Sequence, residues 1–201
     1  MDRDVRRGLT LAAGAAGIAV VAVVVIGVVV LAIRSDTSRH QPGGGGAAAE
    51  LKPTEGSTAR GRVVFFEAAT RGVRVVAHVE GLAPGEHGFH IHENGDCSAP
   101  DASSAGGHFD PTGMPHAGPE AERRHAGDLG NLTADESGMA HLERVDTHLS
   151  LEGGGSIVGR AVVVHAGRDD LTSQPAGDAG GRLACGVIGP DGDRAGARPE
   201  P

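Results

Sequence analysis

The sequence predicts an all-β domain, an antiparallel Greek-key barrel or sandwich, preceded by one N-terminal transmembrane helix. From residue 47 onward, short runs rich in Val, Phe, Ile and Ala alternate with clusters of Gly, Pro and Asp, which is the pattern of strands joined by turns. No segment of this part repeats its apolar residues with the roughly 3.6-residue period of an amphipathic helix. Long connections between some of the runs fit the crossing connections of a Greek key.

The transmembrane helix is predicted over residues 9–33, which carry no charge and are rich in Val, Ala and Gly. At about 1.5 Å per residue, a helix of this length exceeds the roughly 30 Å hydrocarbon core of a bilayer. A cleaved signal peptide is the alternative, but its apolar core usually runs only about 7 to 15 residues. Arginines flank the segment, three before it (Arg3, Arg6 and Arg7) and two after it (Arg34 and Arg39). Their excess on the N-terminal side predicts a signal anchor with residues 1–8 in the cytoplasm and the domain on the extracytoplasmic side.

The rest of the chain divides into a linker, one domain and a tail, because 201 residues suit one domain of ordinary size with appendages. Residues 34–46 include four consecutive glycines and predict a flexible linker. Residues 47–189 form the predicted domain. Residues 190–201 are rich in Gly, Pro and charge, and predict a disordered tail.

Within the domain, the strands are expected at runs of β-branched and aromatic residues. With four phenylalanines and neither Trp nor Tyr in the chain, the core is expected to consist of Val, Leu, Ile and Ala. The expected strands are residues 62–67, 73–80, 139–144, 156–165 and 182–188, with a hairpin turn at 68–72 and another turn at 81–85.

The histidines predict two metal sites. His90 and His92 place two imidazoles on one face of an extended segment, because strand side chains alternate. A Gly- and Pro-rich loop then offers three histidines and a carboxylate, which suit a closed tetrahedral zinc site; these residues are His108, His116, His125 and Asp128. Copper(II) prefers a tetragonal field of imidazoles, which His90, His92, His165 and one further histidine can supply. Four of the remaining histidines are expected to be ordinary surface or core residues (His40, His78, His141 and His148), and the class of His87 is left open at this point.

Five motifs resemble the copper/zinc superoxide dismutase family. They occur in order at residues 88–93 (GFHIHE), 105–111 (AGGHFDP), 125–132 (HAGDLGNL), 159–165 (GRAVVVH) and 180–189 (GGRLACGVIG). The resemblance covers about residues 47–189 and implies that family's Greek-key barrel. The short spacing between His92 and Cys97 is similar to that of the bacterial members, which implies a bacterial cell envelope as the location.

The resemblance also implies a role for each site residue. Copper is expected on His90, His92, His108 and His165, and zinc on His108, His116, His125 and Asp128. His108 then bridges the two metals and carries a proton during superoxide dismutation. Asp169 is expected to orient ligands of both metals, and Arg182 to attract the anionic substrate. Two cysteines in an exported domain suggest one bridge, with two buried free thiols as the alternative; the resemblance implies a Cys97–Cys185 disulfide.

The charge balance is acidic, with 18 Lys and Arg against 26 Asp and Glu. Nucleic acid is therefore not expected as a partner. Superoxide is an anion, so the metals and local cations must make the site positive. Arg182 is the first candidate, followed by Arg123, Arg124 and Arg168.

Two other functions compete with the enzyme. A copper/zinc-binding chaperone or storage module could use the same ligands without turnover, and is the main alternative. A copper-only enzyme would lack the zinc ligands, all of which are present here. The sequence leaves the oligomeric state open, a homodimer included.

Overall fold

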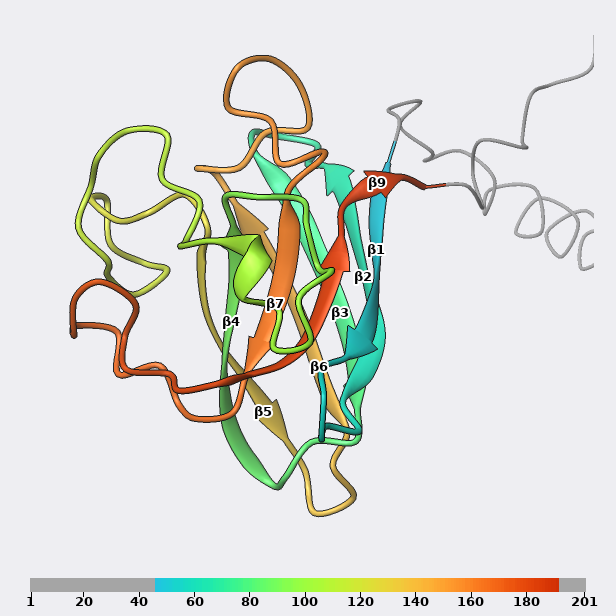
Figure 1. Cartoon of the computed structure of the whole chain (residues 1–201). Helices are drawn as coiled ribbons and strands as arrows, with labels where there is room; N and C mark the ends of the chain where they lie inside the picture. The colour runs from blue at the N-terminus through green and yellow to red at the C-terminus, as the bar shows by residue number, and fades with distance from the viewer. Residues whose placement is uncertain (1–45, 192–201) are drawn as a thin grey trace, which may run out of the picture. The chain divides into compact units, whose positions relative to one another are not determined.

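The protein folds as a closed barrel of eight antiparallel strands (Figure 1), as the computed structural model shows for residues 46–191, the part that it describes. The strands are β1 (Ala47–Pro53), β2 (Arg60–Glu67), β3 (Val73–Glu80), β4 (Gly85–His92), β5 (Asp128–Ala134), β6 (Ala140–Asp146), β7 (Ala161–His165) and β8 (Arg182–Val187). Around the barrel their order is β1-β2-β3-β6-β5-β4-β7-β8, and β8 pairs again with β1. The connections from β3 to β4 and from β6 to β7 cross other strands, so the all-β, antiparallel prediction is confirmed.

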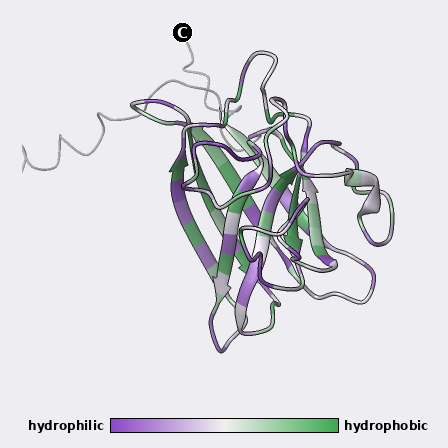
Figure 2. Cartoon of the chain, turned by 90° about the vertical axis from the view of Figure 1, so that its left-hand side faces the viewer, coloured by the Kyte–Doolittle hydropathy of each residue, from purple (hydrophilic) through white to green (hydrophobic). Residues whose placement is uncertain are grey.

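The barrel forms because its strands alternate inward apolar residues with outward polar ones, as the bands along the strands in Figure 2 show. In β3, Val73, Val75 and Ala77 are fully buried, whereas Arg74 and His78 are exposed. The core is mainly aliphatic, as predicted. Three of the four phenylalanines also contribute to it, Phe65, Phe89 and Phe109.

Three strands, β1, β4 and β5, were not among those expected, and several predicted strands differ at their ends. The strand expected at residues 156–165 begins only at Ala161. Gly159 has φ +83°, and the Arg160 amide donates to the Ile157 carbonyl, so the first half of this run is a turn. The folded part also continues past residue 189, because β9 (Gly189–Pro190) pairs with the start of β1.

Two long loops leave the barrel on the same side, on the left in Figure 1. The first, residues 93–127, joins β4 to β5, and the second, residues 166–181, joins β7 to β8. The first contains a short 3-10 helix, Ser103–Ala105, whose alanine packs against the outside of β7 and β8. A disulfide links Cys97 in this loop to Cys185 in β8, as predicted, with a Cα–Cα distance of 5.8 Å.

The predicted transmembrane segment at residues 9–33 lies outside the described residues, as do most of the linker and most of the tail. Within residues 46–191, no helix has the length and apolar character needed to cross a membrane.

Candidate metal centre

Two buried clusters of metal-ligating side chains lie side by side. The first, called here the four-histidine cluster, contains His90, His92, His108 and His165. The second, the histidine–aspartate cluster, contains His108, His116, His125 and Asp128. Within each cluster the ligand atoms lie within 4.8 Å of one another. The structure therefore brings together the same two sets that the sequence suggested, with His108 in both.

Neighbouring strands position the four-histidine cluster. β4 carries His90 and His92, and β7, which pairs with β4, ends at His165. The register of β4 against β5 shifts between Gly88 and His90, and that of β7 against β8 shifts just before His165. Such irregularities re-aim side chains at the end of a strand. An isolated bridge between His92 and His108 then brings the first loop onto β4.

Backbone carbonyls orient two of these rings. His92 donates from Nδ1 to the Gly106 carbonyl (2.9 Å), and His165 donates from Nδ1 to the Gly180 carbonyl (3.2 Å). Each ring then has its Nε2 lone pair available, and the two Nε2 atoms face each other at 3.3 Å. Four ligands held tetrahedrally at about 2.0–2.1 Å from a metal are about 3.3 Å apart, so this spacing suits two ligands of one ion.

The other two rings also present a free nitrogen. His90 uses Nε2 to contact a carboxylate and leaves Nδ1 without a hydrogen-bond partner in residues 46–191. His108 contacts Asp128 through Nδ1 and leaves Nε2 without a partner in the same range. Buried nitrogens are normally hydrogen-bonded, so these exceptions need an explanation. A metal ion at the centre of the cluster supplies one.

The histidine–aspartate cluster gathers around one carboxylate oxygen. Asp128 Oδ1 lies 2.7 Å from His108 Nδ1, 3.0 Å from His116 Nδ1 and 3.3 Å from His125 Nδ1. Its other oxygen accepts from the backbone amides of Ala117 and His125, which fixes the direction of Oδ1. Three nitrogens and one oxygen at these spacings match a closed tetrahedral site.

Asp169 connects the two clusters. Its Oδ2 accepts from His90 Nε2 (2.8 Å), and its Oδ1 accepts from His116 Nε2 (3.0 Å). The carboxylate is fully buried. Burial raises its pKa, but the hydrogen bonds from His116 and His90 outweigh this and hold the pKa well below its usual range. One charged group thus orients a ring in each cluster.

Burial and carboxylates act oppositely on the ring pKa values. Burial lowers the pKa to about 2 for His92, about 3 for His165 and about 4 for His90. These rings are neutral at physiological pH and keep the lone pair that a metal needs. Burial also lowers the pKa of His116, but its hydrogen bonds to Asp128 and Asp169 outweigh this and raise it to about 9. A metal ion there takes the place of that proton.

A family model for copper/zinc superoxide dismutase matches residues 59–188. The chain belongs to this family. The match confirms the resemblance seen in the sequence, and copper and zinc are the cofactors that the family and the two clusters indicate. The residues present fit both metals, because the first cluster offers four imidazoles to copper and the second offers a closed N₃O set to zinc.

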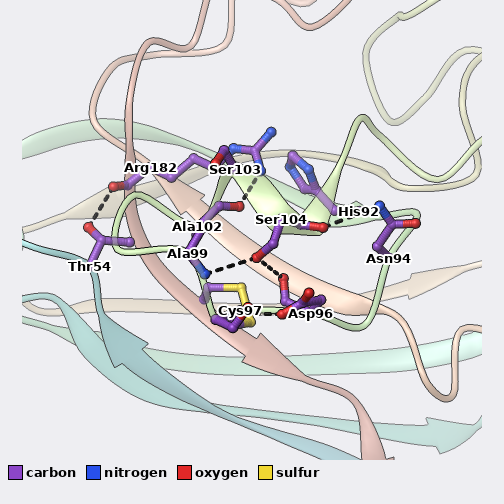
Figure 3. The surroundings of a disulfide bond; sticks show 12 residues. Thr54, His92, Asn94, Asp96, Cys97, Ala99, Ala102, Ser103, Ser104 and Arg182 are labelled. Atoms are coloured by element: carbon purple, nitrogen blue, oxygen red, sulfur yellow. Dashed lines mark hydrogen bonds between the residues drawn. A yellow bond between two sulfur atoms is a disulfide. The ribbon is translucent and has the colours of Figure 1, made fainter.

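In this member of the superoxide dismutase family, Arg182 lies near His92 of the four-histidine cluster (Figure 3). It donates to the Ala102 carbonyl and, at 2.6 Å, to the Gly106 carbonyl. Gly106 is the residue that also accepts from His92, so one carbonyl fixes both the arginine and a cluster ring. The Cys97–Cys185 disulfide holds the same loop on β8. Within residues 46–191 the guanidinium of Arg182 contacts carbonyls and forms no ion pair, although the carboxylate of Asp101 acts on it from a greater distance; its positive charge is therefore available near the site.

Two of the other suggested cations, Arg124 and Arg168, pair with carboxylates; the third, Arg123, is exposed. Arg124 is buried and donates to both oxygens of Asp146 at 2.6 and 2.7 Å. It also donates to the carbonyls of His125 and Asp128, and so connects the end of the first loop to the barrel. Arg168 is exposed and pairs with Glu86. The expectation that Arg124 contributes free positive charge at the site was therefore wrong, because a buried carboxylate neutralises it.

Sequence reasoning missed two amide side chains that hold the centre. Asn131 exchanges hydrogen bonds with the backbone of Asp169, donating to its carbonyl and accepting from its amide. Gln174, from the second loop, makes the same two-way contact with the backbone of His116. Neither pair is close in sequence, so no local pattern could identify these residues. His87 is in neither cluster, and both its ring nitrogens contact carbonyls, those of Ala83 and His165.

Proposed function

We propose that this protein is a superoxide dismutase, which converts two superoxide ions and two protons into one O₂ and one H₂O₂. The observation that carries the proposal is the four-histidine cluster, in which four buried rings present free nitrogens to one point beside a cationic arginine. A carrier protein needs to release its metal, whereas these rings are fixed by carbonyls and by a buried carboxylate. Rigid ligands favour a metal that stays and reacts.

Copper, when bound, supplies one-electron chemistry, because it is stable as both Cu(II) and Cu(I). The histidine–aspartate cluster has four protein ligands and no open position, which suits a structural ion. The buried Arg124 donates to the carbonyls of His125 and Asp128 and so fixes two residues of this cluster. The cluster therefore stiffens the loop that carries His108.

His108 is the residue placed to carry a proton. Its Nδ1 is fixed at Asp128, and its Nε2 is buried with no partner in residues 46–191. A proton can be held at Nε2 whenever that nitrogen is not bound to a metal. Because H₂O₂ requires two protons, a ring that holds one next to the reacting centre shortens the path of that proton.

A hollow of about 360 Å³ adjoins the cluster at His165 and is lined by the second loop, including Gln174, Pro175 and Asp178. Arg182 is fixed at the Gly106 carbonyl, which also accepts a hydrogen bond from His92 of the cluster. A guanidinium there attracts a small anion and orients it toward the cluster. The second loop carries no lysine, and the protein as a whole is acidic. The positive charge of Arg182 must therefore attract the anion in spite of the negative charge of the rest of the protein.

The substitution His165→Ala tests the proposal. It removes one ring from the four-histidine cluster and none from the histidine–aspartate cluster. We expect superoxide consumption and copper to be lost while one zinc per chain is retained. His141→Ala, at an exposed histidine outside both clusters, is the matched control and keeps both metals of the metal centre. Turnover retained in the His165 variant contradicts the copper assignment, and full metal content without turnover in the wild type supports the non-catalytic binding module instead.

We further propose that residues 9–33 anchor the domain on the extracytoplasmic side of a bacterial membrane. The support is the uncharged length of this segment and the arginines before it. The disulfide adds to it, because such bonds persist in oxidising compartments. Protease added to intact cells is expected to remove the domain; protection until the membrane is broken contradicts the orientation.

A further inference from the structure

Two histidines outside the metal centre face each other on the outer surface of the barrel. His78 in β3 and His141 in β6 are direct partners in the register of these adjacent strands. Their neighbours Ala77 and Ala140 are buried in the core, so the two imidazoles point outward, and both residues are exposed. Because strands of a closed barrel fix them, the two side chains are arranged before any ligand arrives.

The geometry of the pair suits a shared cation. The two Nδ1 atoms are 3.3 Å apart, with the ring centroids 4.4 Å apart. Only one proton or one cation fits between two nitrogens at this distance. Two ligands about 2.0–2.1 Å from a tetrahedral metal are separated by about 3.3 Å, which is the spacing seen here. It is also the spacing of His92 Nε2 and His165 Nε2 in the four-histidine cluster.

The surroundings of the pair carry a small excess of negative charge. His78 and His141 line a hollow of about 630 Å³ together with three carboxylates and two guanidinium groups, those of Glu50, Glu80, Asp135, Arg60 and Arg62. Glu80 pairs with Arg60, and Glu50 contacts Arg62. Within residues 46–191, Asp135 accepts hydrogen bonds from Ser137 and from the Met139 amide, and it forms no ion pair. The local balance therefore favours a cation.

We propose that His78 and His141 form a second metal site, which binds a divalent transition-metal cation of the zinc type through both Nδ1 atoms. The site goes beyond the proposed activity and shares no residue with either cluster. Within residues 46–191, no third His, Cys, Asp or Glu stands at ligand distance from the pair, so water completes the coordination. Two protein ligands with water bind a cation in an exchangeable way, unlike the closed zinc site.

The test is a zinc titration of the full chain after it has been loaded with one copper and one zinc. Zinc sulfate is added in a non-chelating buffer, and binding is followed by calorimetry and by the imidazole NMR signals. We expect one further zinc, with the signals of His78 and His141 shifting first. Either His78→Ala or His141→Ala weakens this binding by about 100-fold, because two linked ligands become one. His148→Ala is the matched control and leaves it unchanged.

Three results overturn the site: no further zinc is bound, the His78 and His141 variants bind it as the wild type does, or the shifted signals belong to other histidines. Neither substitution touches the metal centre, so the resident copper and zinc and the superoxide consumption stay as in the wild type. Failure of this proposal is thereby distinguished from failure of the proposed enzyme. Circular dichroism verifies that both variants fold, which is expected for exposed positions.

Discussion

The substitution Asp169→Asn removes the charge that joins the two clusters while keeping the size of the side chain. In the wild type, Oδ1 accepts from His116 Nε2 and from the Leu171 amide, and Oδ2 accepts from His90 Nε2. An amide has one oxygen and one NH₂ group, so it can accept from only one of the two rings. The other ring then faces a donor in a site with no access to water.

Both metal affinities are expected to fall, because a buried negative charge beside both cations is lost. The ring left without an acceptor must change its tautomer or its orientation, and its metal suffers more. Losing the partner that orients a metal-bound histidine costs about 10–100-fold in affinity, which is about 1.4–2.7 kcal/mol. The orientation of the side-chain amide in Asp169→Asn decides which ring keeps an acceptor. The metal site of the other ring, His90 or His116, then shows the larger loss of affinity.

The assay is competition with chelators of known affinity, performed separately for copper and for zinc. Asp170→Asn is the matched control, since it removes the same charge one residue further on, where the carboxylate is exposed and contacts only the second loop. The reasoning is refuted if Asp169→Asn binds both metals as tightly as the control. A loss confined to the control would refute it as well.

Three further predictions concern stability and proton release. Replacing Cys97 and Cys185 by alanine opens a loop with a sequence separation of 88 and is expected to lower the free energy of unfolding by about 4–5 kcal/mol in the chain-entropy model; a urea titration that shows no loss contradicts this. Arg124→Met removes the close cationic partner of the buried Asp146 and leaves it only Arg144, at 3.8 Å; the substitution is expected to cost about 3–5 kcal/mol, most of which Arg124→Met/Asp146→Leu recovers, and equal stability of the single variant and the wild type in urea would argue against the ion pair. In the metal-free protein the pKa of His116 is raised to about 9, so its contribution to stability is complete below about pH 6.5 and is lost as the pH rises through 9. Zinc binding at pH 8 must therefore release about one proton from His116, measurable by calorimetry in buffers of different ionisation enthalpy; no release contradicts the raised pKa.

The sequence predicted the fold where local pattern and tertiary structure agree. β3 shows the clearest alternation, and it was placed at its observed residues, 73–80. β1 has the sequence AAAELKP, which has weak strand propensity, and it became visible only through its pairing with β2 and β8. The turn before β7 was predicted as strand because it contains isoleucine and valine, which favour strands. Their contribution outweighed that of Gly159, which favours a turn.

The two clusters of metal-ligating side chains were predictable because their residue types and spacings, and the family motifs around them, lie in the sequence itself. The groups that fix them were not. The carbonyls of Gly106 and Gly180 carry no sequence signal, and Gln174 reaches His116 from another loop. The burial of Arg124 depended on Asp146, which only the folded barrel places beside it.

The His78–His141 pair illustrates the same limit. In the sequence these are two isolated histidines, and the prediction treated them as ordinary surface residues. Their contact requires the register of β3 against β6, which no local pattern specifies.

The most direct test of the account is the rate of superoxide consumption by the full chain, measured together with its copper and zinc content. We predict rapid dismutation at one copper and one zinc per chain, with activity proportional to copper. A chain that holds both metals in full and does not accelerate the loss of superoxide contradicts the enzyme and leaves a metal-binding module.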